Sequence, residues 1–226
     1  MEKSFVIKGN ICQTKNPKEL DLHENSFVVC VDGISKGIFN VLPEEYKELP
    51  LYDHGDTLIF PGMVDLHVHA PQYAFRGMCM DLELMDWLNR YTFPEEAKYD
   101  DFVYAEKAYG MFVDALKNGA TSRACVFATV HRFATELLMK QMEESGLVSY
   151  IGKVNMDREA SEELLEASAD ISAQTTIDWI EAVKDSFPHT MPILTPRFVP
   201  CCTDELMGKL KDIQMTYGIP VQSHLS

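Results

Sequence analysis

The sequence has few positive charges and no long apolar run. Lysine and arginine number 20 against 35 aspartates and glutamates, which gives a formal net charge of −15 at pH 7. Nucleic-acid backbones and anionic membranes would repel such a surface. No apolar stretch approaches the roughly 20 residues that cross a bilayer, and no signal-peptide core follows the first residues. We therefore expect no nucleic-acid partner, no membrane partner and a cytoplasmic location.

The six cysteines form no C-x-x-C pair, although Cys201 and Cys202 are adjacent. A cytoplasmic protein keeps its thiols reduced, so a disulfide framework is excluded. We expect these cysteines to be packing residues. The sequence also lacks a P-loop, a G-x-G-x-x-G turn, a G-x-S-x-G elbow and an H-E-x-x-H helix. Nucleoside-triphosphate and serine-hydrolase chemistry consequently lose support.

Two textures divide the chain near residue 61. Residues 1–60 contain short β-favouring runs broken by glycine and proline, which predicts a small β domain. Its expected strands are 4–7, 26–31, 36–41 and 57–60. Residues 61–226 alternate apolar runs with stretches of helical periodicity, the pattern of a parallel α/β fold.

Five apolar runs in the second part are short enough to be buried parallel strands. They are residues 63–68, 121–128, 149–155, 191–197 and 219–224. The helices expected between them are 102–118, 131–145, 170–186 and 203–216, the last with Thr203 as N-cap. Residues 70–101 form a long insertion after the first of these strands, and long loops of this kind usually carry function.

Histidines stand at the ends of the first and fifth predicted strands. Alternation along a strand places His67 and His69 on one side of the chain, where two imidazoles can bind one metal ion. The carboxyl ends of barrel strands meet at one mouth, so His224 could supply a third nitrogen there. The alternative is a polar strand end without a metal.

Residues 61–69, Pro-Gly-Met-Val-Asp-Leu-His-Val-His, resemble the opening metal motif of the amidohydrolase superfamily. Further segments extend the resemblance to the guanine deaminases of that superfamily across residues 58–226. They are His67-Val-His-Ala-Pro-Gln-Tyr73, Asp86-Trp-Leu, Tyr91-Thr-Phe-Pro94, Phe127-Ala-Thr, Gly152-Lys-Val, Met156-Asp157, Thr195-Pro-Arg-Phe198 and Gln222-Ser-His-Leu-Ser226. The resemblance implies an incomplete (β/α)8 TIM-type barrel, about five strands of eight, with a small N-terminal β-sandwich domain.

By the same resemblance one metal ion, zinc or iron, would be bound by His67, His69 and His224. Gln72 and Arg197 would read the purine edge, with Phe198 beside them. Glutamine offers an acceptor and donors, and arginine offers fixed donors, which matches the oxo and ring-nitrogen edge of guanine. The implied reaction converts guanine and water to xanthine and ammonia, and a homodimer is expected of the full-length protein.

The resemblance also places a proton-transferring glutamate directly after Ser226, with a later histidine and aspartate beyond it. We therefore expect the chain to be the N-terminal part of such an enzyme and inactive alone. Two alternatives stay open. One is another mononuclear amidohydrolase, acting on a different nucleobase or on a triazine, and the other is a non-catalytic scaffold.

Overall fold

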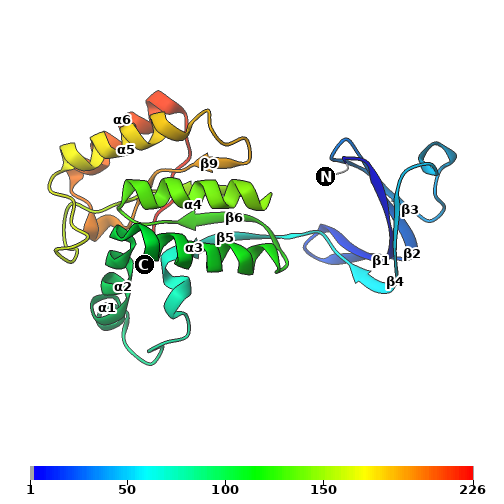
Figure 1. The fold of residues 1–226 in the computed structure, drawn as a ribbon, viewed down its shortest axis with the longest axis horizontal. Helices are drawn as coiled ribbons and strands as arrows, with labels where there is room; N and C mark the ends of the chain where they lie inside the picture. The colour runs from blue at the N-terminus through cyan, green and yellow to red at the C-terminus, as the bar shows by residue number, and fades with distance from the viewer. Residues whose placement is uncertain (1–2, 226) are drawn as a thin grey trace. The chain divides into compact units, whose positions relative to one another are not determined.

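The structure is a computed structural model that describes residues 3–225 of the chain. It consists of two compact units, Met1–Gly62 and Met63–Ser226 (Figure 1). Among the described residues, no helix has the length and apolar content needed to cross a membrane.

The first unit is built on one four-stranded sheet with the order β3-β2-β1-β4. Its strands are β1 (Phe5–Asn16), β2 (Glu19–Val31), β3 (Ile34–Phe39) and β4 (Leu51–Ile59). A short 3-10 turn, η1 (Glu44–Tyr46), lies between β3 and β4. β1 and β2 pair antiparallel far beyond the apolar runs of the sequence, because ladder hydrogen bonds also hold polar strand segments. The described residues thus form the small β domain that the sequence predicts, as a single sheet where the resemblance implies a sandwich.

The second unit is an α/β structure with a parallel sheet of order β5-β6-β7-β9, the partial barrel that the sequence predicts. The strands are β5 (Met63–His69), β6 (Thr121–Phe127), β7 (Val148–Gly152) and β9 (Thr190–Pro192). A second parallel pair, β8 (Val154–Asn155) with β10 (Thr195–Pro196), continues the third and fourth predicted strands. β5 lies at the sheet edge, and Leu66 on it is 76% exposed.

Four long helices follow the predicted ranges to within a few residues. They are α3 (Phe102–Lys117), α4 (Arg132–Ser145), α5 (Ala169–Val183) and α6 (Asp204–Tyr217), and Figure 1 shows α3 and α4 alongside β5 and β6. Side chains of Asp101, Ser168 and Thr203 accept hydrogen bonds at the starts of α3, α5 and α6, so the predicted Thr203 cap is confirmed. Trp179, Tyr109, Phe112 and Leu138 fill the core between helices and sheet.

Two predicted features differ from the structure. The run 219–224 forms no strand and makes only isolated bridges, Leu194 with Val221 and Phe198 with His224. A strand requires a continuous ladder, and these two bridges are separated. The insertion 70–101 is not an open loop but a chain of short helical turns: η2 (Ala70–Phe75), α1 (Leu84–Trp87), η3 (Leu88–Thr92), α2 (Phe93–Ala97) and η4 (Lys98–Asp100). A further turn, η5 (Val199–Cys201), follows β10.

Candidate metal centre and adjoining pocket

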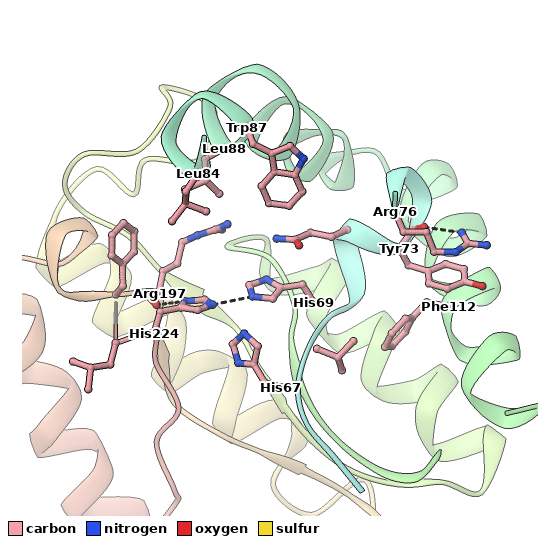
Figure 2. A pocket seen from close by; sticks show the side chains of 14 residues that line it. His67, His69, Tyr73, Arg76, Leu84, Trp87, Leu88, Phe112, Arg197 and His224 are labelled. Atoms are coloured by element: carbon pink, nitrogen blue, oxygen red, sulfur yellow. Dashed lines mark hydrogen bonds between the residues drawn. The ribbon is translucent and has the colours of Figure 1, made fainter. Parts of the chain in front are cut away.

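Three histidines from two distant segments converge at the carboxyl end of β5. His67 and His69 lie two residues apart on that strand, and His224 approaches from the segment after α6 (Figure 2). One ligand nitrogen from each lies within 4.8 Å of the others, and the Nε2 atoms of His69 and His224 are 3.0 Å apart. Strand alternation therefore brings both β5 imidazoles to the side that His224 reaches.

The backbone of Arg197 orients His224. The Nδ1 atom of His224 lies 2.6 Å from the Arg197 carbonyl oxygen, and the His224 amide donates to the same oxygen at 3.1 Å. A carbonyl oxygen can only accept, so Nδ1 carries the proton and Nε2 keeps its lone pair for a ligand. Fixing a histidine by its second nitrogen is typical of metal centres.

The local environment favours the uncharged form of His69 and of His224. Burial and the nearby Arg197 charge hold the pKa of His69 well below its ordinary value, and burial lowers the pKa of His224. The ring of Phe127 stacks on His69 with centroids 4.5 Å apart, which supplies part of this desolvation. Neutral imidazole is the form that binds a metal ion.

The three residues fit a divalent ion of the zinc type. Two nitrogens at about 2.0–2.1 Å from one tetrahedral ion lie about 3.3–3.4 Å apart, close to the separation of the His69 and His224 Nε2 atoms. Imidazole suits zinc and iron alike. Among the described residues no carboxylate joins the cluster, so these three histidines could hold an ion and leave further coordination positions open.

The histidines form one end of a cavity of about 550 Å³. Its lining includes the three residues to which the resemblance assigns base recognition: Gln72, Arg197 and Phe198. Side chains of Leu84, Trp87 and Leu88, from the helical insertion, make the opposite apolar wall in Figure 2. The structure thus brings all six sequence-predicted site residues to one cavity, whose size suits a small planar ligand.

Arg197 is held by a partner that the sequence analysis did not single out. Its Nη1 donates to Glu96 Oε2 at 2.5 Å and its Nη2 to Glu96 Oε1 at 3.1 Å, with Arg197 2% and Glu96 1% exposed. Burial lowers the pKa of Arg197, but the Glu96 carboxylate outweighs it and the pKa is raised. The guanidinium also lies 5.0 Å from the centroid of Phe93, on the same helix α2 as Glu96.

Nothing in the local sequence indicates that Glu96 is buried, because it stands among other acidic residues in the segment 95–101. A carboxylate is buried only when a cation or several donors compensate it, and here the cation lies 101 residues away in sequence. Spacing along the chain contains no sign of that pairing. The one local indication was the Phe93-Pro94 segment, which starts the helix that carries Glu95 and Glu96 within the insertion.

Comparison with known proteins identifies the family. The model of the amidohydrolase family matches residues 58–226, three quarters of the chain, and the chain belongs to this family. Within it, the chain is similar to guanine deaminases. It is 40% identical to the guanine deaminase of Dictyostelium discoideum over 77% of this chain, and 38% identical to that of Mus musculus over 81%.

A solved structure of guanine deaminase from C. acetobutylicum, with guanine bound in its active site, superposes with a TM-score of 0.95 at 42% identity and covers 99% of this chain. The chain spans about half the length of the relatives that it matches. It covers 39% and 40% of the two curated proteins and 53% of the solved chain.

Proposed function

We propose that this chain carries the metal-binding and base-recognition part of a guanine deaminase, which hydrolyses guanine to xanthine and ammonia. The observation that carries the proposal is the shared cavity of the three-histidine cluster and the Gln72 and Arg197 side chains. The 42% identity to a guanine deaminase with bound guanine supports the choice of base.

His67, His69 and His224 would hold the metal ion, zinc in this proposal, with iron as the alternative. When bound, such an ion supplies Lewis acidity that activates water for attack on the amidine carbon of the base. The chain's own contribution is to keep three imidazoles converged at one end of the cavity. The Arg197 carbonyl fixes the His224 tautomer, and Phe127 packs against the His69 ring.

Gln72 and Arg197 would hydrogen-bond the edge of the base, and Phe198 would pack beside it. All three line the cavity that the histidines close at one end. The apolar wall of Leu84, Trp87 and Leu88 would exclude bulk water from the ring and strengthen those polar contacts. A base that lacks an oxo acceptor would leave buried donors unpaired, which is costly.

The activity is proposed for a polypeptide of the relatives' length, of which this chain spans about half. A homodimer in the cytoplasm is part of the same proposal. Six free cysteines, two of them buried, are consistent with a reducing compartment.

Other ring substrates and a non-catalytic scaffold are the competing functions. A deaminase or chlorohydrolase for a triazine would share the histidines but would not need an arginine and a glutamine at one cavity edge. A scaffold would not need three imidazoles whose ligand nitrogens lie within 4.8 Å of one another. Neither alternative is favoured by a specific feature of the cavity.

The test is xanthine formation from guanine, with added zinc, by this chain and by a chain continued to the relatives' length. We expect turnover by the longer form only, with one zinc per chain by elemental analysis. Zinc binding without turnover of guanine, but with turnover of another amino- or chloro-substituted ring, would overturn the substrate. Absence of bound metal in both forms would favour the scaffold.

A further inference from the structure

The two side chains proposed to recognise the base, Gln72 and Arg197, both donate hydrogen bonds to the buried carboxylate of Glu96. Glu96 accepts the two Arg197 hydrogen bonds described above, and Gln72 Nε2 donates to Glu96 Oε1 at 3.4 Å. Glu96 itself is 1% exposed and lies behind Arg197 and Gln72, which face the cavity.

We propose that Glu96 is a positioning residue that sets the hydrogen-bonding pattern which the cavity presents to the base. This inference rests on the proposed function, because it concerns how the same site selects its ligand. Glu96 acts through Arg197 and Gln72 and does not line the cavity.

The donors that remain on Arg197 are fixed by this pairing. A guanidinium has five N–H groups in a rigid plane, and Glu96 takes one from each terminal nitrogen. Three N–H groups are left, and their directions follow from the plane that the two-point contact imposes. The ring of Phe93 on the same helix limits rotation of that plane further.

The amide of Gln72 is oriented by the same carboxylate. A carboxylate accepts hydrogen bonds and does not donate, so the Gln72 nitrogen turns toward Glu96 and its carbonyl oxygen is left as an acceptor. Without Glu96 the amide could rotate by half a turn and offer donors in place of that acceptor. The cavity edge therefore combines donors from Arg197 with an acceptor from Gln72, the complement of a ring that carries an acceptor and a donor.

Charge provides a second reason for Glu96. Arg197 alone would give the buried cavity a positive charge and attract anions, whereas the Arg197–Glu96 pair is neutral in sum. The neutral pair recognises an uncharged heterocycle by the geometry of its hydrogen bonds and not by net charge. The site is thus suited to a free base and poorly suited to phosphate-bearing or other anionic ligands.

The experiment compares Glu96→Gln with Glu95→Gln in the form of the protein that turns over guanine. Glu95 is the adjacent residue on α2, and its carboxylate bonds Lys98 and Tyr104 outside the cavity. Guanine binding is measured on metal-free protein by intrinsic tryptophan fluorescence, to which Trp87 of the cavity lining contributes, and KM and kcat are measured on the zinc-loaded protein. Glu96→Asp, which keeps the charge on a shorter side chain, is the conservative variant.

We expect Glu96→Gln to raise both Kd and KM for guanine roughly tenfold to hundredfold, with a much smaller change in kcat and one zinc per chain retained. Glu96→Asp should recover part of the affinity, and Glu95→Gln should match the parent. An unchanged Kd in Glu96→Gln, with only a lower unfolding midpoint, would show that the pair is merely structural and overturn the inference. If the parent protein itself fails to bind guanine, the proposed function fails, and this inference fails with it.

Discussion

Two buried pairs of opposite charge lie in the α/β unit, and their surroundings differ. Lys153 Nζ lies 2.6 Å from Glu166 Oε1, with the lysine side chain 0% and the glutamate side chain 10% exposed. The second Glu166 oxygen accepts from the Met156 amide and the Ser172 hydroxyl. That pair is satisfied from within the fold, and neither member lines the cavity.

The Arg197–Glu96 pair is also buried, with side chains 3% and 1% exposed, but Arg197 lines the cavity. Three guanidinium N–H groups have no hydrogen-bond partner among residues 3–225 after Glu96 is bound. Burying a charged pair seldom adds net stability compared with apolar residues of the same size. A pair with spare donors at a cavity therefore indicates ligand recognition, whereas a fully satisfied pair indicates a structural role. The following variants test that distinction.

Lys153→Met should have the largest effect on folding. It leaves the Glu166 carboxylate buried without its cation, which costs about 3–5 kcal/mol of the free energy of unfolding. Urea unfolding should show a clear drop in the midpoint, while guanine affinity of the folded protein stays unchanged. The double variant Lys153→Met/Glu166→Leu should regain most of the loss. A single variant as stable as the parent would mean that the pair is not tightly coupled.

Ser172→Ala should weaken the same internal pair less. Its hydroxyl donates to Glu166 Oε2 at 2.5 Å and accepts from Asn155 Nδ2 at 2.8 Å. Removing it leaves buried polar atoms short of partners, at a cost of about 1–3 kcal/mol in unfolding free energy. Thr175→Ala on the same helix is the control, since its hydroxyl bonds only the Ile171 carbonyl. Equal losses in both variants would contradict a special role for the internal network.

Arg197→Lys should affect binding more than folding. Lysine keeps the charge but cannot bond Glu96 at two points or present planar donors to a base. We expect guanine affinity, measured by fluorescence titration, to fall roughly tenfold to hundredfold. Arg132→Lys is the control, because Arg132 pairs with Glu136 on the partly exposed surface of α4. If Arg197→Lys strongly destabilised the fold and left guanine affinity unchanged, both buried pairs would have a structural role only.

The sequence predicts the helices and their caps well, and it predicts contacts between residues far apart in the chain poorly. The four long helices follow apolar periodicity and caps such as Thr203, which are properties of neighbouring residues. The strand ranges were less accurate. The third predicted strand divides at Lys153, a buried charged residue that belongs to no strand, and the fifth has no continuous ladder.

The site shows the same limit. His67 and His69 follow from strand alternation, and the structure brings His224 to them as the resemblance implied, although metal ligation itself stays a prediction. Glu96 could not be found in this way. Its burial depends on Arg197, and a carboxylate in an acidic segment looks the same in sequence whether it faces water or a guanidinium.

Cysteine labelling changes no residue of the protein and tests whether the interior beside the internal pair is closed. Cys202 is buried, and its Sγ contacts the Asn155 carbonyl oxygen at 3.3 Å. Burial raises the pKa of Cys201 to about 11 and that of Cys202 to about 12. A raised thiol pKa reduces the reactive thiolate at pH 8, so alkylation should be roughly a hundredfold to a thousandfold slower than for an unfolded cysteine.

Iodoacetamide labelling followed by mass spectrometry measures this site by site. Half-buried Cys79, in the helical insertion, provides the internal comparison in the same sample. Labelling of Cys201 and Cys202 should accelerate about tenfold for each pH unit between 8 and 10, because the thiolate fraction rises in that proportion below the pKa. In urea above the unfolding midpoint all six cysteines should react alike. Rapid labelling of Cys202 in the native protein at pH 8 would show that the region beside the Lys153–Glu166 pair opens readily. The satisfied hydrogen bonds of that pair would then no longer distinguish it from the Arg197–Glu96 pair at the cavity.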